Sequence, residues 1–487
     1  MPIHYSMTWH AMPAQARFTI LGPVLTMLWM ECGLVTAAEP RPEIPGVDAA
    51  FLDELQARIF AYFWETTNAE NGLVPDRWPS PSGSSIAAVG FGLTAYAVGV
   101  ERGYVTREQA AERVRTTLRF FWNAPQSEHP SAATGYRGFF YHFLDMKTGL
   151  RQGQCELSSI DTTLLIAGAL FCREYFDREN PLESEIRELS DKLYRRVDWQ
   201  WMQPRQPLIC MAWTPESGLG DHDYRGYSEA MLLYVLALGS PTHPIDAAAW
   251  EAYTSTYHWA EFYGQQHLNF GPLFGHQYSH VWIDFRGIRD PFMQAKGIDY
   301  FENSRRATYS QRAYAIANPH GWRDYSEEIW GLTACDGPVN KRLPFAGQER
   351  QFHTYWARGA SDQYVNDDGT IAPTAAGGSI PFAPEIAIPA LRAMRERYGE
   401  HLFGKYGFLD SFNPSFTFQD VQLTHGKIVP GVGWIDTDYL GIDQGPILLM
   451  SENFRSELIW KAIKSSPYIQ HGLQRAGFVG GWLDKHR

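Results

Sequence analysis

Helical periods follow one another along almost the whole chain from Val47 onward, separated by segments rich in Gly and Pro. In the first period, apolar residues recur at the spacing of one helix face, at Phe51, Leu55, Ile59, Phe60 and Phe63. We expect helices over residues 48–63, 85–103, 106–122, 158–176, 183–197, 227–238, 244–265, 289–295, 297–317, 326–333, 383–398, 439–461 with a break, and 466–477. Strand signals are sparse, so the pattern predicts an all-α fold of about twelve helices.

No low-complexity linker divides these periods, and no repeat of fixed length recurs along the chain. A helical solenoid should show a clearer repeat, so a single toroid of helical hairpins is the favoured arrangement. Three long stretches, residues 124–155, 334–380 and 405–438, collect Gly, Pro, Asp and Trp instead of helical periods. Loops longer than about 12–15 residues are usually functional in a compact domain, so the site is expected among them.

The first 38 residues have the pattern of an export signal rather than of a folded element. Arg17 precedes the apolar run of residues 18–30, and small residues follow at 35–38. A membrane-spanning helix needs roughly 20 apolar residues, so this run is too short for one. We therefore expect residues 1–38 to be a cleaved signal peptide, residues 39–487 to form one domain, and the protein to be periplasmic or secreted.

The composition of the chain favours some classes of binding partner and argues against others. The formal net charge of −12 argues against nucleic acid, which prefers a basic face. Aromatic residues make up 14% of the chain, and their rings either fill a large core or line a site for flat, amphipathic ligands such as sugars. No integral membrane span is expected.

Motifs for metals, cofactors and several enzyme classes are missing. The four cysteines after residue 38 form no C-x-x-C pair and no histidine stands at zinc spacing, so no metal is expected and buried free thiols are favoured. No G-x-S-x-G elbow, phosphate loop or dinucleotide fingerprint occurs, so no cofactor is expected either.

Two acidic segments lead directly into apolar helical periods. In the first, Ser158 and Asp161 fit a helix-capping pattern, which alone would explain Asp161. A first-turn carboxylate, together with Glu156 just before the helix, would equally suit a base or a substrate anchor. In the second segment, Glu229 follows Asp223 and Tyr227, and apolar neighbours could raise its pKa as a general acid requires.

Two later segments repeat this order of polar residues followed by apolar ones. Convergent carboxylates beside aromatic rings are what hydrolysis of glycosidic bonds uses. The later of these two segments contributes Asp443, a second candidate catalytic aspartate. The candidate substrate-binding residues of the four segments are Tyr227, Asp223, Trp330, Asp336, Trp434, Gln444 and Glu452.

Four ordered motifs together resemble the bacterial glucoamylase-like family, which includes the β-1,2-glucanases. They are SSIDTTLLIAGAL around Asp161, YSEAMLLYVLALGSP around Glu229, EIWGLTACDGP, and LGIDQGPILLMSENFRSELIW around Asp443. The resemblance runs from about Leu55 to Gly477. It implies an (α/α)6 barrel, six helical hairpins with long loops at the active-site end, and inverting hydrolysis of a β-glucan. The family typically has Asn where this chain has Ser228.

We therefore expect an exported glycoside hydrolase acting on a glucan or gluco-oligosaccharide, with β-1,2-glucan favoured. Glu229 is expected to be the acid and Asp161 the base-side or anchoring carboxylate, while Glu156 or Asp443 could hold either role. Inversion needs room for a water, so the paired carboxyl groups should stand roughly 6.5–9.5 Å apart. A polysaccharide lyase on a similar toroid and a sugar-binding protein without hydrolysis are the alternatives.

Overall fold

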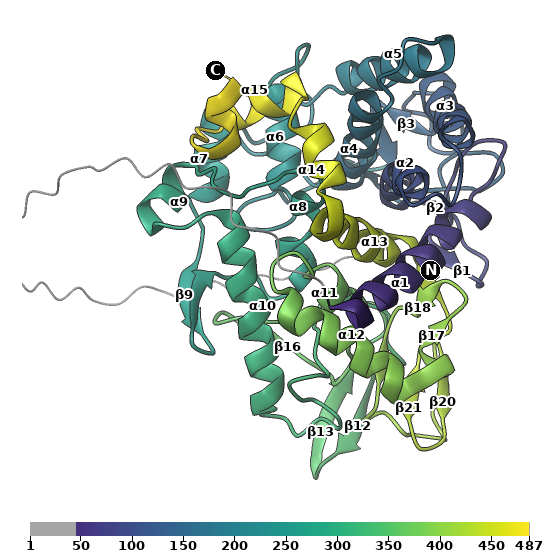
Figure 1. Cartoon of the computed structure of the whole chain (residues 1–487), viewed down its shortest axis with the longest axis vertical. Helices are drawn as coiled ribbons and strands as arrows, with labels where there is room; N and C mark the ends of the chain where they lie inside the picture. The colour runs from purple at the N-terminus through teal and green to yellow at the C-terminus, as the bar shows by residue number, and fades with distance from the viewer. Residues whose placement is uncertain (1–44, 487) are drawn as a thin grey trace, which may run out of the picture.

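The computed structural model describes residues 45–486, so the predicted signal peptide lies outside the described residues. Its helices are α1 (Gly46–Glu65), α2 (Ile86–Glu101), α3 (Arg107–Asn123), α4 (Ser159–Tyr175), α5 (Pro181–Arg196), α6 (Met231–Gly239), α7 (Ala248–Thr254), α8 (Tyr278–Trp282), α9 (Pro291–Lys296), α10 (Tyr300–Ala317), α11 (Pro373–Gly377), α12 (Pro384–Tyr398), α13 (Gly441–Ser456), α14 (Leu458–Ile463) and α15 (Pro467–Arg475). Figure 1 shows how these helices fill most of the molecule.

Four of the helices are buried on nearly every side and form the interior. Helix α6 is buried along its whole length, and α2 from Ile86 to Gly99, because their sequences are almost continuously apolar. Helix α13 packs on α2, α2 on α4, and α4 on α6. Gly90 and Gly168 let α2 and α4 approach closely, since a Cβ on Gly168 would lie 2.2 Å from the carbonyl oxygen of Gly90.

The remaining long helices cover this interior with one apolar face each. Helix α3 packs on α5, α5 on α4, α1 on both α13 and α2, and α12 on α11 (Figure 1). Polar residues fill the outer faces, as is usual for surface helices. Helix α3 begins with the capping box predicted from its sequence, in which Thr106 and Gln109 exchange hydrogen bonds.

Short strands join the starts of the interior helices. Strands β2 (Ser84–Ser85), β6 (Leu157–Ser158) and β22 (Tyr439–Leu440) lead into α2, α4 and α13. Strand β1 (Arg77–Trp78) pairs with β22, β2 with β5 (Phe143–Leu144), and β6 with β4 (Phe139–Tyr141). These pairings bring the N-terminal ends of α2, α4 and α13 to the same side of the molecule.

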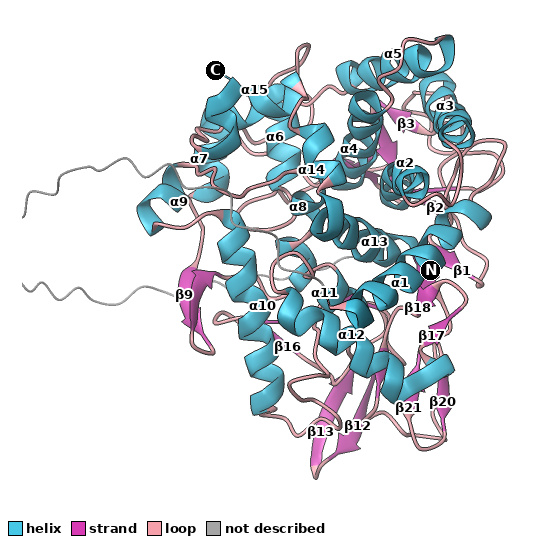
Figure 2. Cartoon of the chain, viewed as in Figure 1, coloured by secondary structure: helices cyan, strands magenta, loops and turns pink. Residues whose placement is uncertain are grey.

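The expectation of an all-α class is only partly right, because the long stretches fold into many short strands. The others are β3 (Gly135–Tyr136), β7 (Ala212–Thr214), β8 (Gly218–Leu219), β9 (Trp259–Phe262), β10 (Gln265–Leu268), β11 (Ala334–Cys335), β12 (Lys341–Phe345), β13 (Gln348–Phe352), β14 (Trp356–Ala357), β15 (Gly359–Ala360), β16 (Val365–Asn366), β17 (Phe403–Gly404), β18 (Gly407–Phe408), β19 (Phe412–Asn413), β20 (Lys427–Val429) and β21 (Gly433–Ile435). Figure 2 shows β12, β13, β17, β18, β20 and β21 in its lower part.

Three expected helices differ from the structure. Residues 326–333 are not helical: Gly331 and Leu332 pair their backbone groups with distant segments, including the side chain of Gln311. Residues 244–265 keep only the short α7 before turning into the β9–β10 hairpin. The helix expected from Tyr227 begins only at Met231, so Glu229 lies in the turn before it.

The cysteine prediction is confirmed within residues 45–486, since Cys155, Cys172, Cys210 and Cys335 are all free thiols. Three of them are buried and Cys155 is half-buried. In the same part of the chain, no helix combines the length and the apolar character that crossing a bilayer requires.

Candidate active site

Three of the predicted catalytic carboxylates belong to neighbouring helix starts. Asp161 lies in the first turn of α4, Asp443 in the first turn of α13, and Glu229 just before α6. The side chain of Tyr278 is buried, and burial raises its pKa far above the ordinary value. The negative charges of Asp443, Glu229 and Asp161 raise this pKa further, so all three carboxylates lie near Tyr278. The structure therefore brings Asp161, Glu229 and Asp443 to one region.

Backbone hydrogen bonds hold these helix starts in place. The amide of Gly441 donates to the carbonyl oxygen of Asp76 over 2.8 Å, which ties α13 to the segment before β1. The hydroxyl of Ser279 donates to the carbonyl oxygen of Glu229 over 2.8 Å, which ties the α6 start to α8. The hydroxyl of Thr374 donates to the carbonyl oxygen of Asp443 over 3.1 Å.

His142 joins Glu156 to Asp161. Its Nδ1 lies 2.8 Å from Oε1 of Glu156, and its Nε2 lies 3.6 Å from Oδ1 of Asp161. Ser158 Oγ donates to the other oxygen of Asp161 over 2.5 Å and accepts the Asp161 amide over 3.2 Å. Asp161 is thus both part of the helix cap and part of this group, which we name the histidine triad: His142, Glu156 and Asp161.

Charge within the histidine triad favours an imidazolium. Burial by itself would lower the pKa of His142, but the carboxylates of Asp161 and Glu156 outweigh it and raise that pKa to about 9. For Glu156, burial acts to raise the pKa, yet the hydrogen bond and the charge of His142 hold it below its usual value. At neutral pH the imidazolium therefore faces a charged Glu156.

Glu229 has the properties of a proton donor. Burial raises its pKa to about 7, and the nearby negative charge of Asp161 adds to the shift. Its side chain is nevertheless partly exposed, so a substrate can reach it. The buried Tyr224 lies in the field of Glu229, Asp161 and Glu156 together, which links Glu229 to the histidine triad.

Asp443 belongs to a second group, which we name the aspartate cluster: Asp336, Asp410, Asp436 and Asp443. All four residues are 4% exposed or less. One oxygen from each of Asp336, Asp410 and Asp436 lies within 4.8 Å of the others. Burial and the neighbouring carboxylates raise the pKa of Asp410 to about 6 and push those of Asp436 and Asp443 well above their ordinary values.

Asp76 connects the two groups electrostatically. Burial raises its pKa, while the positive charges of Arg77 and His142 oppose that shift and the charge of Asp336 adds to it. Arg77 in turn donates from Nη1 to Oδ2 of Asp336 over 2.6 Å. The histidine triad and the aspartate cluster therefore both lie near Asp76.

Most of the predicted substrate-binding residues do not present their side chains to a ligand. Trp330 and Trp434 are fully buried, and the indole of Trp434 donates to the carbonyl oxygen of His425. Tyr227 and Gln444 are also buried, and Gln444 donates to the carbonyl oxygen of Phe408 over 2.7 Å. These four contribute to the core rather than to an open surface.

Asp223 and Glu452 are each engaged in an ion pair with an arginine. Asp223 accepts two hydrogen bonds from Arg205, at 2.6 and 2.8 Å. Glu452 is buried in the fourth turn of α13, where Arg102 donates to both of its oxygens at 2.8 and 2.9 Å. Nine positions separate Glu452 from Asp443, about 13 Å along a helix, so Glu452 does not join the site.

Several residues of the site escaped prediction. His142 and Asp436 were not among the candidate residues. Asp76 and Arg77 carried a signal that could have been used, two opposite charges directly before Trp78 and Pro79. Asp410 has no local signal, because only the fold brings it to Asp336 and Asp436.

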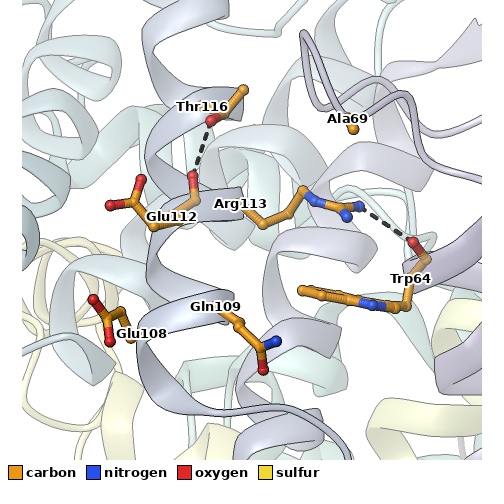
Figure 3. Close-up of a pocket in the computed structure, with 7 residues that line it drawn as sticks. All are labelled: Trp64, Ala69, Glu108, Gln109, Glu112, Arg113 and Thr116. Carbon is orange, nitrogen blue, oxygen red and sulfur yellow. Dashed lines mark hydrogen bonds between the residues drawn. The ribbon is translucent and has the colours of Figure 1, made fainter.

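A surface pocket elsewhere contains none of these residues. It is lined by Trp64, Ala69, Glu108, Gln109, Glu112, Arg113 and Thr116 from the end of α1 and from α3 (Figure 3). Arg113 stacks over the Trp64 ring at 4.3 Å and donates to the Trp64 carbonyl oxygen over 3.3 Å. Its two carboxylates, Glu108 and Glu112, both belong to α3, and none of the candidate catalytic residues lines it, so the chemistry is not assigned to this pocket.

The family model described as "Putative glucoamylase" matches residues 221–467, which include Glu229 and the whole aspartate cluster. This chain belongs to the glucoamylase-like family. The resemblance seen in the four sequence motifs is thereby confirmed.

Relatives in the glucoamylase-like family include proteins named for β-1,2-glucans. The chain is 30% identical over 467 residues to the exo β-1,2-glucooligosaccharide sophorohydrolase (non-reducing end) of Parabacteroides distasonis, covering 88% of this chain. It spans only 58% of that relative's length. Among solved structures, a "putative glucoamylase" of Bacteroides uniformis is 32% identical with a TM-score of 0.75, covering 90% of this chain and 100% of that one.

An endo-β-1,2-glucanase of Chitinophaga pinensis, solved with sophorotriose and glucose, is 28% identical with a TM-score of 0.75. The match covers 89% of this chain and 99% of that chain. Each of these likenesses covers 88–90% of this chain.

Proposed function

We propose that this chain is a glycoside hydrolase that cleaves β-1,2-glucan or its oligosaccharides by an inverting acid/base mechanism. The observation that carries the proposal is Glu229, a carboxyl group with a pKa of about 7 placed beside Asp161. A carboxyl group that keeps its proton close to neutral pH, with a second carboxyl group nearby, is the equipment of such a reaction. The β-1,2 linkage rests on two of the three relatives, the proteins of Parabacteroides distasonis and Chitinophaga pinensis, which are named for it.

Glu229 would act as the acid. Its carboxyl group holds a proton below about pH 7 and is partly exposed, so it can protonate the glycosidic oxygen as the bond breaks. The developing charge on the sugar then lies near several carboxylates, which suits an oxocarbenium-like transition state.

Asp161 would act on the side of the base. Ser158 donates to one of its oxygens, and His142 lies 3.6 Å from the other, so both hold the carboxylate in one orientation. A carboxylate so placed can accept a proton from the attacking water. Glu156, whose pKa is lowered by His142, would keep the imidazolium charged and in place.

The proposal extends to the finer fold and to the place of action. The buried helices α2, α4, α6 and α13, each covered by an outer helix, support an (α/α)6 toroid of six hairpins. The absence of a linker supports one domain over residues 39–487. The charge and apolar pattern of residues 1–38 supports export to the periplasm or the medium.

The test is incubation of the purified chain with linkage-defined β-glucans and gluco-oligosaccharides, followed by sizing of the products. We expect cleavage of β-1,2-linked substrates and little of β-1,3, β-1,4 or β-1,6 linkages. Release of only sophorose would indicate exo action, and a ladder of lengths endo action. Binding of β-1,2-glucan without cleavage would contradict hydrolysis and favour the sugar-binding alternative.

A further inference from the structure

Three carboxylates of the aspartate cluster each use only one oxygen. Oδ2 of Asp336 accepts from Arg77 at 2.6 Å, and Oδ2 of Asp410 accepts from the Asp336 amide at 2.7 Å. Oδ1 of Asp436 accepts from the Thr437 amide at 2.6 Å. The other oxygen of each residue is enclosed and accepts no hydrogen bond from an N–H or hydroxyl group, although the carboxyl groups of Asp410 and Asp443 lie within hydrogen-bond reach of each other. Buried polar atoms are almost always satisfied, so three such oxygens together call for an explanation.

Within the described residues, few positively charged side chains lie near these oxygens. Within residues 45–486, Arg77 forms ion pairs with Asp336 and Asp438, and His425 lies 3.9 Å from Oδ1 of Asp336. No basic side chain of that part of the chain forms an ion pair with Asp410 or Asp436. Burying carboxylates without compensating charge is strongly unfavourable, so a proton or a cation must neutralise them.

The three carboxylates are held in position by the strands around them. Asp336 follows β11, Asp410 precedes β19, and Asp436 follows β21. Strands β19 and β21 pair, and the Asp436 amide donates to the Ser411 carbonyl oxygen over 3.0 Å. This arrangement gives three oxygen donors from distant parts of the chain a fixed separation before any ligand binds.

That separation matches an oxygen-coordinated ion. One oxygen from each residue lies within 4.8 Å of the others. Ca²⁺ binds oxygens at about 2.3–2.6 Å, so two ligands on opposite sides of it are up to about 5 Å apart. Ca²⁺ also tolerates irregular geometry, whereas Mg²⁺ requires a near-ideal octahedron and Zn²⁺ prefers nitrogen and sulfur.

We propose that Asp336, Asp410 and Asp436 form a binding site for a divalent cation and that the ion it takes is Ca²⁺. Asp443, whose Oδ2 is also enclosed and whose carboxyl group lies within hydrogen-bond reach of Asp410, is a fourth donor at the edge of the site. The ion would hold the long segment 334–380, through Asp336, against the long segment 405–438, through Asp410 and Asp436. This site goes beyond the proposed hydrolysis and does not depend on it, and it replaces the sequence-based expectation of no metal.

The test measures binding directly on the full chain after dialysis against EDTA. CaCl₂ is titrated by calorimetry, and Tb³⁺ is titrated by its luminescence under tryptophan excitation, since Trp434 stands two positions from Asp436. Asp410→Asn and Asp436→Asn keep the side-chain shape and remove the charge. Asp420→Asn, an exposed acid between them in the chain, is the matched control.

We expect one Ca²⁺ per chain, a higher unfolding temperature with CaCl₂, and about tenfold or greater weakening in Asp410→Asn and Asp436→Asn. The control should bind like the original chain. No binding at millimolar CaCl₂, or equal affinity in all variants, would overturn the site and leave shared protons as the neutralising charge. If the variants do not fold, a Tb³⁺-soaked crystal decides: an anomalous peak among the three carboxylates supports the site, and its absence there overturns it.

Discussion

Nε2 of His142 lies 3.6 Å from Oδ1 of Asp161, while Nδ1 of the same ring lies 2.8 Å from Oε1 of Glu156. One imidazole therefore couples two carboxylates that stand on either side of a helix start. Because the two carboxylates raise the pKa of His142 to about 9, the imidazole ring is positively charged near neutral pH. This contact gives Asp161 a fixed orientation that the helix cap alone would not.

The pairing of His142 with Glu156 should stabilise the fold in a pH-dependent way. Folding raises the pKa of His142 from 6.5 to about 9. The charged ring therefore stabilises the fold fully below pH 6.5, and this stabilisation is lost as pH rises through about 9. A double-mutant cycle with His142→Gln and Glu156→Gln should give a coupling of about 1–2 kcal/mol near pH 6. Urea unfolding measures it, and a coupling that is as large above pH 10 would contradict this assignment.

The pH dependence of hydrolysis should report Glu229. Because the acid must be protonated and its pKa is about 7, kcat/KM should fall as pH rises through that value. Glu229→Gln should lose about 10²–10⁴-fold in kcat with little change in substrate binding. Initial rates on a β-1,2-gluco-oligosaccharide check both expectations. An alkaline limb far above this pH, or one that persists in Glu229→Gln, would assign the acid to another residue.

The same substitution should stabilise the protein above neutral pH. Folding raises the pKa of Glu229 from 4.5 to about 7. The folded state therefore loses stability relative to the unfolded state as pH rises from the lower to the higher value, and the loss is complete above the higher value. Glu229→Gln mimics the protonated form. It should be nearly neutral at acidic pH and raise the free energy of unfolding by about 1–3 kcal/mol near pH 8. Equal effects at both pH values would contradict a raised pKa.

Glu452 should matter for stability and not for substrate. Glu452→Gln leaves Arg102 without its buried partner, so we expect a loss of about 2–4 kcal/mol in the free energy of unfolding. KM should be unchanged because Glu452 lies near the other end of α13 from Asp443. Glu396→Gln, which breaks an exposed pair with Arg392, is the control and should change stability by about 0.5 kcal/mol or less. Normal stability with a raised KM would return Glu452 to the site.

Local sequence rules predicted the parts of the fold that depend on neighbouring residues. The apolar runs of α2, α4, α6 and α13 and the cap at Thr106 are examples, because burial and capping act within a few residues. Asp161 was found for the same reason, since its place after Ser158 fixes it in the first turn of α4.

Contacts between distant segments were not predictable in this way. Residues 326–333 have a helical pattern, but their backbone groups pair with Gln311 and other distant partners. Asp410 reaches Asp336 and Asp436 only because β19 pairs with β21. Glu452 was grouped with Asp443 because both stand in one motif, whereas a helix carries them to different ends. The exposure of Trp78 and the burial of Trp330 likewise depend on the finished fold.

The central claim is that Glu229 protonates the departing sugar while a water attacks from the opposite face. Anomer-resolved NMR of the first product formed from a β-1,2-glucan tests it most directly. We predict that the new reducing end appears first as the α-anomer, before mutarotation, and that Glu229→Gln forms it at least about 10²-fold more slowly. A first product with the β-configuration, or a near-normal rate in Glu229→Gln, would contradict the account.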